Sequence, residues 1–206
     1  MCHGLTLLHT NRIFRCGKTP HRLKGFMKIC VLVNDTPYGV MGLRARHLTT
    51  PLCASHHIDI LYREAGKLTE LRRFSRFIQE NRPDLLYIMN VGYAGGGAAL
   101  LAKCRFHMPY ILDHGDPSYD LLRSSGRPMW ESWLVHGAEW TMLRSADAVV
   151  ARGAALAVSI RQRRPEGVHF LPDGVDLTRF KPLNVDTLRD QNGMSDTLTL
   201  GIVGSI

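Results

Sequence analysis

Short apolar runs recur along the chain, and this alternation with helical patterns constrains the fold more than any other feature. Lys28–Asn34 (KICVLVN) is the first run, and Ile58–Tyr62 (IDILY) and Leu85–Met89 (LLYIM) follow it. Runs that are apolar throughout are typical of strands buried on both faces, as in parallel sheets. Between the second and third runs, the amphipathic pattern of Lys67–Asn81 predicts a helix that ends before Pro83.

The same alternation continues to the end of the chain. Further strands are expected at Pro109–Asp113, Ala148–Ala151, Val168–Leu171 and Leu198–Val203, and further helices at Met41–Ala54, Ala98–Arg105 and Ala154–Arg161 and directly after Pro128. This order predicts an α/β fold, a Rossmann-like doubly wound parallel sheet with right-handed crossovers. Ligands of such sheets bind at the carboxyl ends of the strands, so the residues just after each strand are the candidates for a site.

The positive charge is concentrated at the start of the chain. The formal net charge is +8, and residues 1–26 hold no acidic residue and five basic ones: Arg12, Arg15, Lys18, Arg22 and Lys24. Of the 26 Lys and Arg residues, 21 therefore remain against 18 Asp and Glu, which is a net charge of +3. This mild excess argues against a nucleic-acid partner.

Residues 1–26 have two interpretations. Arg-bearing segments without acidic residues occur in transit peptides, but this one lacks Ser and has only a weak helical pattern. Alternatively, translation begins at Met27, directly before the first strand, or the segment is a disordered tail. We favour the second interpretation and expect 1–26 to be a basic leader that is disordered or not translated.

Cysteine usage and hydropathy indicate a cytoplasmic protein without a metal. The five Cys residues show no CxxC or Cys/His metal spacing, and Cys30 and Cys104 lie in apolar segments typical of buried positions. The uncharged stretch Leu85–Ala102 is long enough to cross a membrane, but Asn90 and Gly95–Gly97 interrupt it, which favours a strand, a turn and a helix. Peripheral contact at the inner membrane face is left open.

Glycines follow two of the predicted strands. Gly39 and Gly42 can let the backbone approach an anion at a helix N-terminus, or they can form a structural turn. Their spacing is not GxGxxG, and no P-loop Lys follows, so the nucleotide signal is weak. Gly95–Gly97 can likewise cradle a phosphate or allow close contact between a helix and the sheet.

The segment Asp113-His114-Gly115-Asp116-Pro117 carries the most chemistry. A His between two carboxylates can be oriented through one ring nitrogen and can donate with the other. We therefore take His114 as the candidate catalytic residue and leave a structural role open. No matching cluster of His and Asp occurs elsewhere, so we expect no metal. Arg152 follows the fifth strand, and Asp173 and Gly174 follow the sixth.

All three Trp residues lie in the predicted helix after Pro128. Trp130, Trp133 and Trp140 recur at spacings of three and seven residues. Core packing is the favoured interpretation of this pattern, and a platform on which a sugar stacks is the alternative. On the helix at Lys67–Asn81, the basic residues Arg72, Arg73 and Arg76 form a face that could contact an anionic lipid surface, although a solvated face is the favoured interpretation.

Pro172–Pro182 (PDGVDLTRFKP) resembles the interdomain hinge of GT-B-fold retaining glycosyltransferases, the glycosyltransferase group 1 or family 4 type. The family pattern P-[ND]-G-V-D-x-x-x-F-x-P is matched at every fixed position. Leu198–Gly204 resembles the strand that follows this hinge, and Ser145–Val150 and Pro109–His114 resemble two strands that precede it. The resemblance covers about residues 28–206.

The resemblance implies a domain organisation. Residues 27–182 would form the N-terminal, acceptor-side Rossmann-like domain. Residues 183–206 would form a linker and the first strand of a C-terminal, donor-binding domain that is otherwise missing. A chain of this kind is expected to be inactive alone. The alternative is a non-catalytic binding domain that docks a separate donor-binding subunit. A dehydrogenase or epimerase is disfavoured by the absent GxGxxG.

The resemblance also implies a reaction. A sugar would pass from a nucleotide-diphosphate donor to a hydroxyl of a glycan, lipid-linked or small-molecule acceptor, with no cofactor and no metal. By analogy, Gly39 and Gly42 would lie under the donor diphosphate, and His114 would lie near the transferred sugar. The remaining residues expected to bind substrate are Asp116, Arg152, Asp173 and Gly174.

Overall fold

The computed structural model describes residues 13–16, 25–116, 128–178, 180–182 and 184–194, together with Leu198 and Leu200. The chain divides into two compact units, Met1–Asp173 and Gly174–Ile206. The first unit contains the sheet and every residue of the site described below except Gly174. The second contains the short helix α7, Asp186–Gln191.

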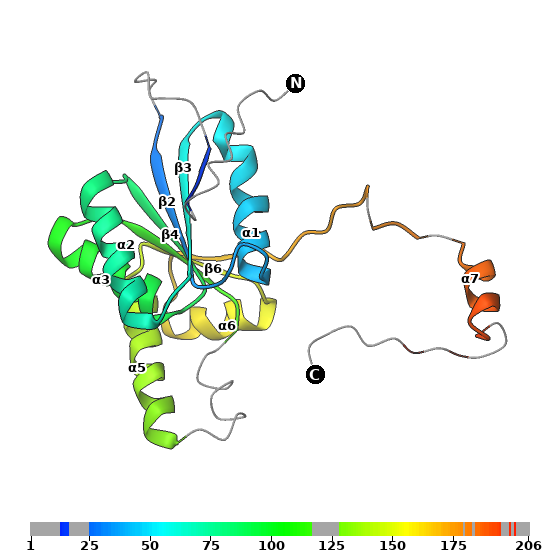
Figure 1. Cartoon of the computed structure of the whole chain (residues 1–206). Helices are drawn as coiled ribbons and strands as arrows, with labels where there is room; N and C mark the ends of the chain where they lie inside the picture. Colours follow the sequence, from blue (N-terminus) through cyan, green and yellow to red (C-terminus); the bar gives the residue numbers. More distant parts are fainter. Residues whose placement is uncertain are drawn as a thin grey trace. The chain divides into compact units, whose positions relative to one another are not determined.

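A seven-stranded sheet in the order β1-β3-β2-β4-β5-β6-β7 forms the centre of the first unit (Figure 1). Its strands are β1 (Ile13–Cys16), β2 (Lys28–Val33), β3 (His57–Tyr62), β4 (Leu85–Met89), β5 (Tyr110–His114), β6 (Ala148–Ala151) and β7 (Val168–Phe170). All neighbouring pairs are parallel except β1 and β3, which are antiparallel. The central strands β2 to β6 are largely buried, which confirms the prediction from their apolar runs.

Helices cover the two faces of the sheet unequally. The helices of the first unit are α1 (Val40–Thr49), a 3-10 turn (Thr50–Ala54), α2 (Lys67–Asn81), α3 (Tyr93–Phe106), α5 (Met129–Ser145) and α6 (Ala154–Arg163). Residues of α2, α3, α5 and α6 share one hydrophobic core with the sheet, whereas α1 packs on the opposite face. The direction of the crossovers explains this. The β2–α1–β3 unit moves toward one edge of the sheet, and the later units move toward the other.

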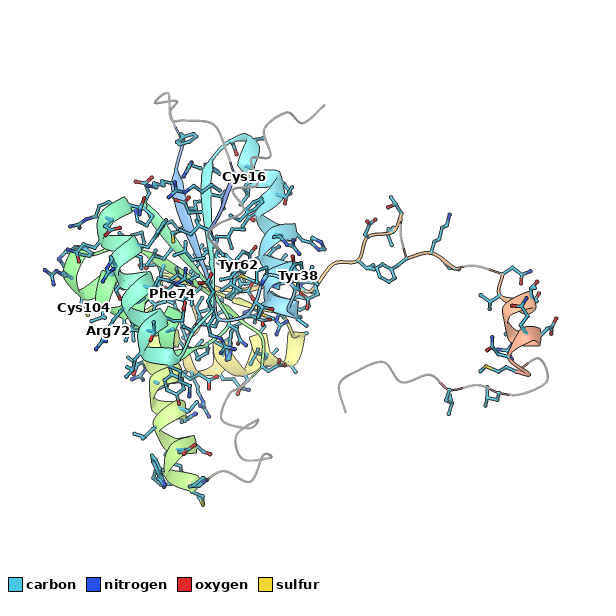
Figure 2. The ribbon with its side chains drawn as sticks, in the orientation of Figure 1. Cys16, Tyr38, Tyr62, Arg72, Phe74 and Cys104 are labelled. Atoms are coloured by element: carbon cyan, nitrogen blue, oxygen red, sulfur yellow. The ribbon has the colours of Figure 1, made fainter. Side chains whose placement is uncertain are left out.

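The apolar stripe predicted on the second helix faces the sheet. Phe74, Phe77 and Ile78 of α2 are buried against the strands. Cys30 is fully buried, as predicted. Cys104 is exposed, contrary to prediction, because it lies on the outer side of α3, and Figure 2 places it at the periphery.

The glycine-rich segment after β4 belongs to a helix, so the predicted turn there is wrong. Helix α3 begins at Tyr93 and contains Gly95–Gly97. A Cβ atom on Gly96 would lie 2.0 Å from Sδ of Met142, and one on Gly92 would lie 2.4 Å from the side chain of Asn34. The small residues therefore allow the helix to pack closely against its neighbours, which favours the packing interpretation over a phosphate cradle.

The predicted disorder of residues 1–26 is wrong for Ile13–Cys16. These residues form β1, which pairs with the edge strand β3 in the register Arg15 opposite Asp59. Nε of Arg15 lies 3.1 Å from Oδ1 of Asp59, and Nε2 of His57 lies 3.3 Å from the same oxygen. The basic segment thus provides a counter-charge for a carboxylate that is almost fully buried in the sheet.

The boundary between the two compact units lies between Asp173 and Gly174, and the predicted N-terminal domain extends to residue 182. The backbone pairing that follows β7 reaches Leu171, whose N–H donates to the carbonyl of Ala151 at 3.0 Å. In the second unit, Asp176 Oδ1 accepts hydrogen bonds from the N–H and hydroxyl of Thr178. The predicted strand Leu198–Val203 falls mostly outside the described residues. Within the described part, no helix is long and apolar enough to cross a membrane.

Candidate functional site

The site lies at the carboxyl edge of the sheet, where β5 ends in Asp113 and His114. Successive side chains of a strand point to opposite faces. Asp113 therefore points toward α1, and His114 points into the layer that contains α5 and α6. Both side chains are almost fully buried. The two carboxylates that neighbour His114 in the sequence have other partners: Asp113 binds Arg44 on the opposite face of the sheet, and Asp116 lies next to Arg152.

On the α1 face, the buried guanidinium of Arg44 forms a network with strand-end groups. Its Nε donates to Oδ2 of Asp113 at 3.0 Å, its Nη1 to Oδ1 of Asp173 at 2.6 Å, and its Nη2 to the carbonyl of Leu171 at 3.0 Å. The hydroxyl of Tyr87 donates to the same Asp113 oxygen at 2.9 Å. We call these five residues the Arg44 network.

The charges of the Arg44 network support one another. Burial alone would lower the pKa of Arg44, but the carboxylates of Asp113 and Asp173 raise it above its ordinary value. Burial raises the pKa of Asp113, and Arg44 and Tyr87 oppose that rise. Burial also raises the pKa of Tyr87, so its hydroxyl keeps its proton and remains a donor to Asp113. The arrangement is a buried cation that joins α1 to the ends of β5 and β7.

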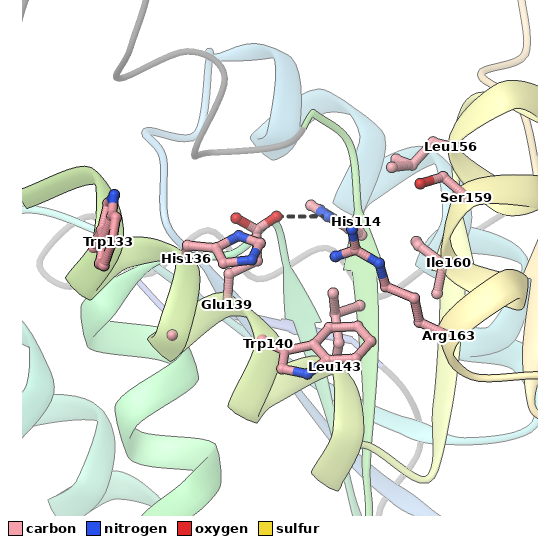
Figure 3. A pocket seen from close by; sticks show the side chains of 11 residues that line it. His114, Trp133, His136, Glu139, Trp140, Leu143, Leu156, Ser159, Ile160 and Arg163 are labelled. Carbon is pink, nitrogen blue, oxygen red and sulfur yellow. Dashed lines mark ion pairs between the residues drawn. The ribbon is translucent and has the colours of Figure 1, made fainter. Parts of the chain in front are cut away.

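On the opposite face, His114 pairs with a carboxylate from α5. Nε2 of His114 lies 2.8 Å from Oε1 of Glu139, and only 1% of His114 and 5% of Glu139 are exposed. Nδ1 of His114 and Oε2 of Glu139 have no hydrogen-bond partner within the described structure. The pair lies at the floor of a groove of about 550 Å³ between α5 and α6 (Figure 3). We call this space the α5/α6 groove.

Arg152 contacts two of the predicted residues at the same edge. Its Nη2 lies 3.4 Å from Oδ2 of Asp116, and its Nη1 lies 3.6 Å from Oδ2 of Asp173. A Cβ atom on Gly115 would lie 1.7 Å from the Arg152 guanidinium, so the glycine makes room for it. The structure therefore brings Arg152, Asp116 and Asp173 together and joins them to the Arg44 network through Asp173.

Gly39 and Gly42 form a tight loop at the N-terminus of α1. The carboxylate of Asp35 accepts hydrogen bonds there from the N–H groups of Thr36 (2.7 Å) and Met41 (3.3 Å). A Cβ atom on Gly39 would lie 2.0 Å from the Asp35 carboxylate, and one on Gly42 would lie 2.2 Å from the Thr36 carbonyl oxygen. These contacts favour the structural-turn interpretation, because a diphosphate bound here would meet a carboxylate already at the helix N-terminus.

Of the three tryptophans of α5, Trp140 packs against the predicted core, and the other two do not. Trp130 is 64% exposed and Trp133 is 66% exposed. Trp140 is half-buried, with the guanidinium groups of Arg144 and Arg163 5.1 and 5.6 Å from its ring centroid. Helix α5 buries a different stripe, which contains Val135, Glu139, Met142 and Leu143.

Sequence reasoning missed Arg44 and Glu139, the two charges that organise the site. Each is a charged residue within the buried stripe of its helix: Arg44 lies next to Ala45, and Glu139 lies four residues after Val135. A charge at such a position signals a buried partner. Gly174 begins the second unit, and a Cβ atom placed on it would meet open space. No group of three His, Cys, Asp or Glu in the described residues could hold a metal.

The fold and its ligand edge define a class: a Rossmann-like domain of the kind that forms the N-terminal half of GT-B glycosyltransferases. The chain belongs to the glycosyl transferase 4-like domain family, whose model matches residues 25–174. It matches no curated protein at a significant level.

Two solved structures share this fold. Sucrose-phosphate synthase of Thermosynechococcus elongatus has a TM-score of 0.59 and 14% identity, over 80% of this chain and 52% of that one. HepE of Anabaena, solved in complex with UDP and glucose, has a TM-score of 0.52 and 18% identity, over 82% of this chain and 51% of that one. The chain thus spans about half the length of each of these structures.

Proposed function

We propose that this chain is the acceptor-side domain of an enzyme that transfers a sugar from a nucleotide-diphosphate donor to a hydroxyl acceptor. The single observation that carries the proposal is the His114–Glu139 pair at the carboxyl edge, because a buried His held by a carboxylate is a group suited to proton transfer at that edge. The family membership of residues 25–174 and the fold shared with HepE support it.

In the proposed reaction, the bond between the anomeric carbon and the diphosphate oxygen breaks, and a bond to the acceptor oxygen forms. The acceptor hydroxyl loses its proton, and the leaving diphosphate gains negative charge. His114 orients or deprotonates the hydroxyl, with Glu139 fixing the ring. Arg152, at the same edge as Asp116 and Asp173, supplies positive charge toward the diphosphate. Gly39, Gly42 and Gly174 were also predicted to contact substrate, but the Asp35 carboxylate beside Gly39 and Gly42 favours a structural turn there.

In this proposal, the donor-binding site belongs to the other half of the enzyme and not to this domain. The chain alone is expected to bind UDP-glucose weakly and to transfer negligibly. In a chimera, residues 1–173 replace the corresponding half of HepE. The remaining half of HepE then supplies the donor side. With UDP-glucose and a glycoside acceptor, it is expected to transfer glucose, and His114→Ala is expected to lower kcat about 100-fold. Transfer by the isolated chain at the rate of an intact enzyme would contradict the proposal.

The same assay tests the alternative of a domain that docks a separate donor-binding subunit. A second polypeptide that co-purifies with the chain and restores transfer on mixing would favour that alternative.

Peripheral membrane contact through α2 stays a prediction. Nη2 of Arg73 lies 2.8 Å from Oε2 of Glu70 in an ion pair. The exposed Arg72 and Arg76 are therefore the residues expected to contact lipid. Co-sedimentation with anionic vesicles tests it, with an Arg72→Gln, Arg76→Gln variant as the control.

A further inference from the structure

Two cysteines that are far apart in the sequence lie at the same end of β3. Cys16 is the last residue of β1, and it is paired with Ile58, the second residue of β3. Cys53 lies in the 3-10 turn Thr50–Ala54, which is separated from β3 by two residues. The antiparallel pairing of β1 with β3 therefore brings the end of β1 to the segment that leads into β3.

Both cysteines also lie on the same face of the sheet. Residues directly opposite each other in an antiparallel pair project from one face, so Cys16 shares the face of Ile58. Ile58 belongs to the hydrophobic cluster on the α1 side, and Cys53 packs against that cluster. Phe14, two residues before Cys16, packs against it as well, as the alternation of side chains along a strand requires. The backbone thus directs the two thiols into one region.

The two thiols interact with each other in that region. A hydrogen bond joins the side chains of Cys16 and Cys53, and Sγ of Cys53 also donates to the carbonyl oxygen of Thr49 at 3.4 Å. Burial raises the pKa of Cys53 to about 12, and the hydrogen bond and the charge of Cys16 add to the rise. Both residues are half-buried, and β1 is the edge strand of the sheet, so the pair lies at the surface of the core. Two adjacent thiols of this kind are the arrangement from which a disulfide forms.

We propose that Cys16 and Cys53 are a redox-sensitive pair, which a peroxide converts reversibly into a disulfide that fastens β1 to the rest of the first unit. Neither sugar transfer nor a second domain enters this proposal. Two other cysteines of the described residues differ from the pair, because Cys30 is fully buried and Cys104 is exposed on α3. A disulfide that forms among otherwise free thiols is of the transient, redox-responsive kind.

The reaction consumes one peroxide molecule for each disulfide. The thiolate of Cys16 attacks a peroxide oxygen, the O–O bond breaks, and an S–O bond forms. This step gives a sulfenic acid on Cys16 and a hydroxide that takes up the thiol proton as water. Cys53 then attacks the sulfenic sulfur, so that the S–S bond forms and the S–O bond breaks. The departing hydroxide takes the proton of Cys53 as a second water. The two thiols together lose two electrons, and the peroxide gains them.

The disulfide would act on the strand that covers the edge of β3. Strand β1 is held by its pairing with β3 and by the ion pair of Arg15 with Asp59. A covalent link at Cys16 would keep β1 in place when these contacts open transiently. Under reducing conditions the thiols stay separate, so the link forms only in response to an oxidant.

Peptide mapping tests the pair directly, because trypsin places the five cysteines of the chain in five different peptides. Cys16 falls in residues 16–18, and Cys53 falls in residues 47–63. The complete folded chain is treated with hydrogen peroxide, its remaining thiols are blocked, and the digest is analysed by mass spectrometry without a reductant. The cross-link between these two peptides is expected to exceed any cross-link of the exposed Cys104 about tenfold or more. Dithiothreitol is expected to reverse it.

Hydrogen exchange measures the effect of the disulfide on β1. The backbone amides of residues 13–16 are expected to exchange about tenfold or more slowly in the oxidised chain than in the reduced chain. Cys53→Ser removes the bond and leaves the sequence of β1 intact, so peroxide is expected to have no effect on the exchange of this variant. Cys104→Ser is the matched control and is expected to respond to peroxide as the wild type does.

The proposal is overturned by any of four results. The first is a folded chain in which peroxide produces no cross-link between Cys16 and Cys53. The second is an equal yield of that cross-link in a chain unfolded in urea, because the fold would then not bring the thiols together. The third is a cross-link that leaves the exchange of β1 unchanged, and the fourth is a slowing of exchange by peroxide that persists in Cys53→Ser.

Discussion

Asp113 and His114 are neighbours in the chain, yet they pair with ions of opposite sign on opposite faces of the sheet. Asp113 meets the guanidinium of Arg44, which keeps its proton at every ordinary pH, and His114 meets the carboxylate of Glu139 through its imidazole. Arg44 also binds backbone carbonyls at the end of β7, whereas the His114–Glu139 pair opens onto a groove. The comparison indicates that the Arg44 pair joins α1 to the strand ends, whereas the His114–Glu139 pair joins α5 to β5.

Replacement of Arg44 should have the largest effect. Arg44→Met leaves the carboxylate of Asp113 buried without its cation and removes the bonds to Leu171 and Asp173, so we expect a loss of about 3–5 kcal/mol in the free energy of unfolding. Urea denaturation measures it. Arg46→Met, on the same helix, is the matched control. Equal losses in both variants would contradict a special role for the Arg44 network.

A second change should recover part of that loss. The double variant Arg44→Met, Asp113→Asn leaves neither charge of the Arg44–Asp113 pair buried. The carbonyl oxygen of the introduced amide can still accept a hydrogen bond from the hydroxyl of Tyr87. We expect the double variant to be about 1–2 kcal/mol more stable than Arg44→Met alone. A double-variant cycle in urea provides the coupling energy. Strictly additive losses would show that the two charges do not depend on each other.

Neutralising the other pair should cost less. Glu139→Gln removes a charge but keeps an amide of the same size that can still form a hydrogen bond with the imidazole of His114. We expect a loss of about 1 kcal/mol, the net value of one hydrogen bond. Thermal unfolding against wild type checks this, with the exposed Glu80→Gln as control. A loss as large as that of Arg44→Met would erase the distinction between the two faces.

The smallest effect is expected for Gly115→Ala, which lies next to Arg152. The carboxylate of Asp173 contacts both Arg152 and Arg44. Gly115→Ala would place a methyl group 1.7 Å from the Arg152 guanidinium, which can swing away because it is the end of a flexible side chain. Since Asp116 and Asp173 are exposed, the lost contacts should amount to less than about 1 kcal/mol. Gly137→Ala, which enters open space, should instead stabilise the protein, and calorimetry of the two variants compares them.

The fold could be predicted from the sequence because its strands are buried on both faces and its helices are bounded by Pro and Gly. The strand at Lys28 and the helix at Lys67–Asn81 were predicted almost to the residue. The site could be predicted only as a location. His114 lies at the carboxyl end of a strand, where ligand sites of parallel sheets are expected. Its partner Glu139 lies 25 residues further on, and only the packing of α5 against the sheet brings the two together. Pairings of this kind depend on tertiary contacts that local patterns do not contain.

Strand β1 has a consequence for how the protein behaves at high concentration. Its hydrogen bonds cover the outer side of β3, so β3 presents no row of free backbone groups along that side. A shortened chain that starts at Met27 would uncover this strand and leave Asp59 without Arg15. Such an edge invites pairing with the same strand of another molecule. The strand Ile13–Cys16 therefore replaces the six-residue edge of β3 with a shorter edge of four residues that carries Arg15.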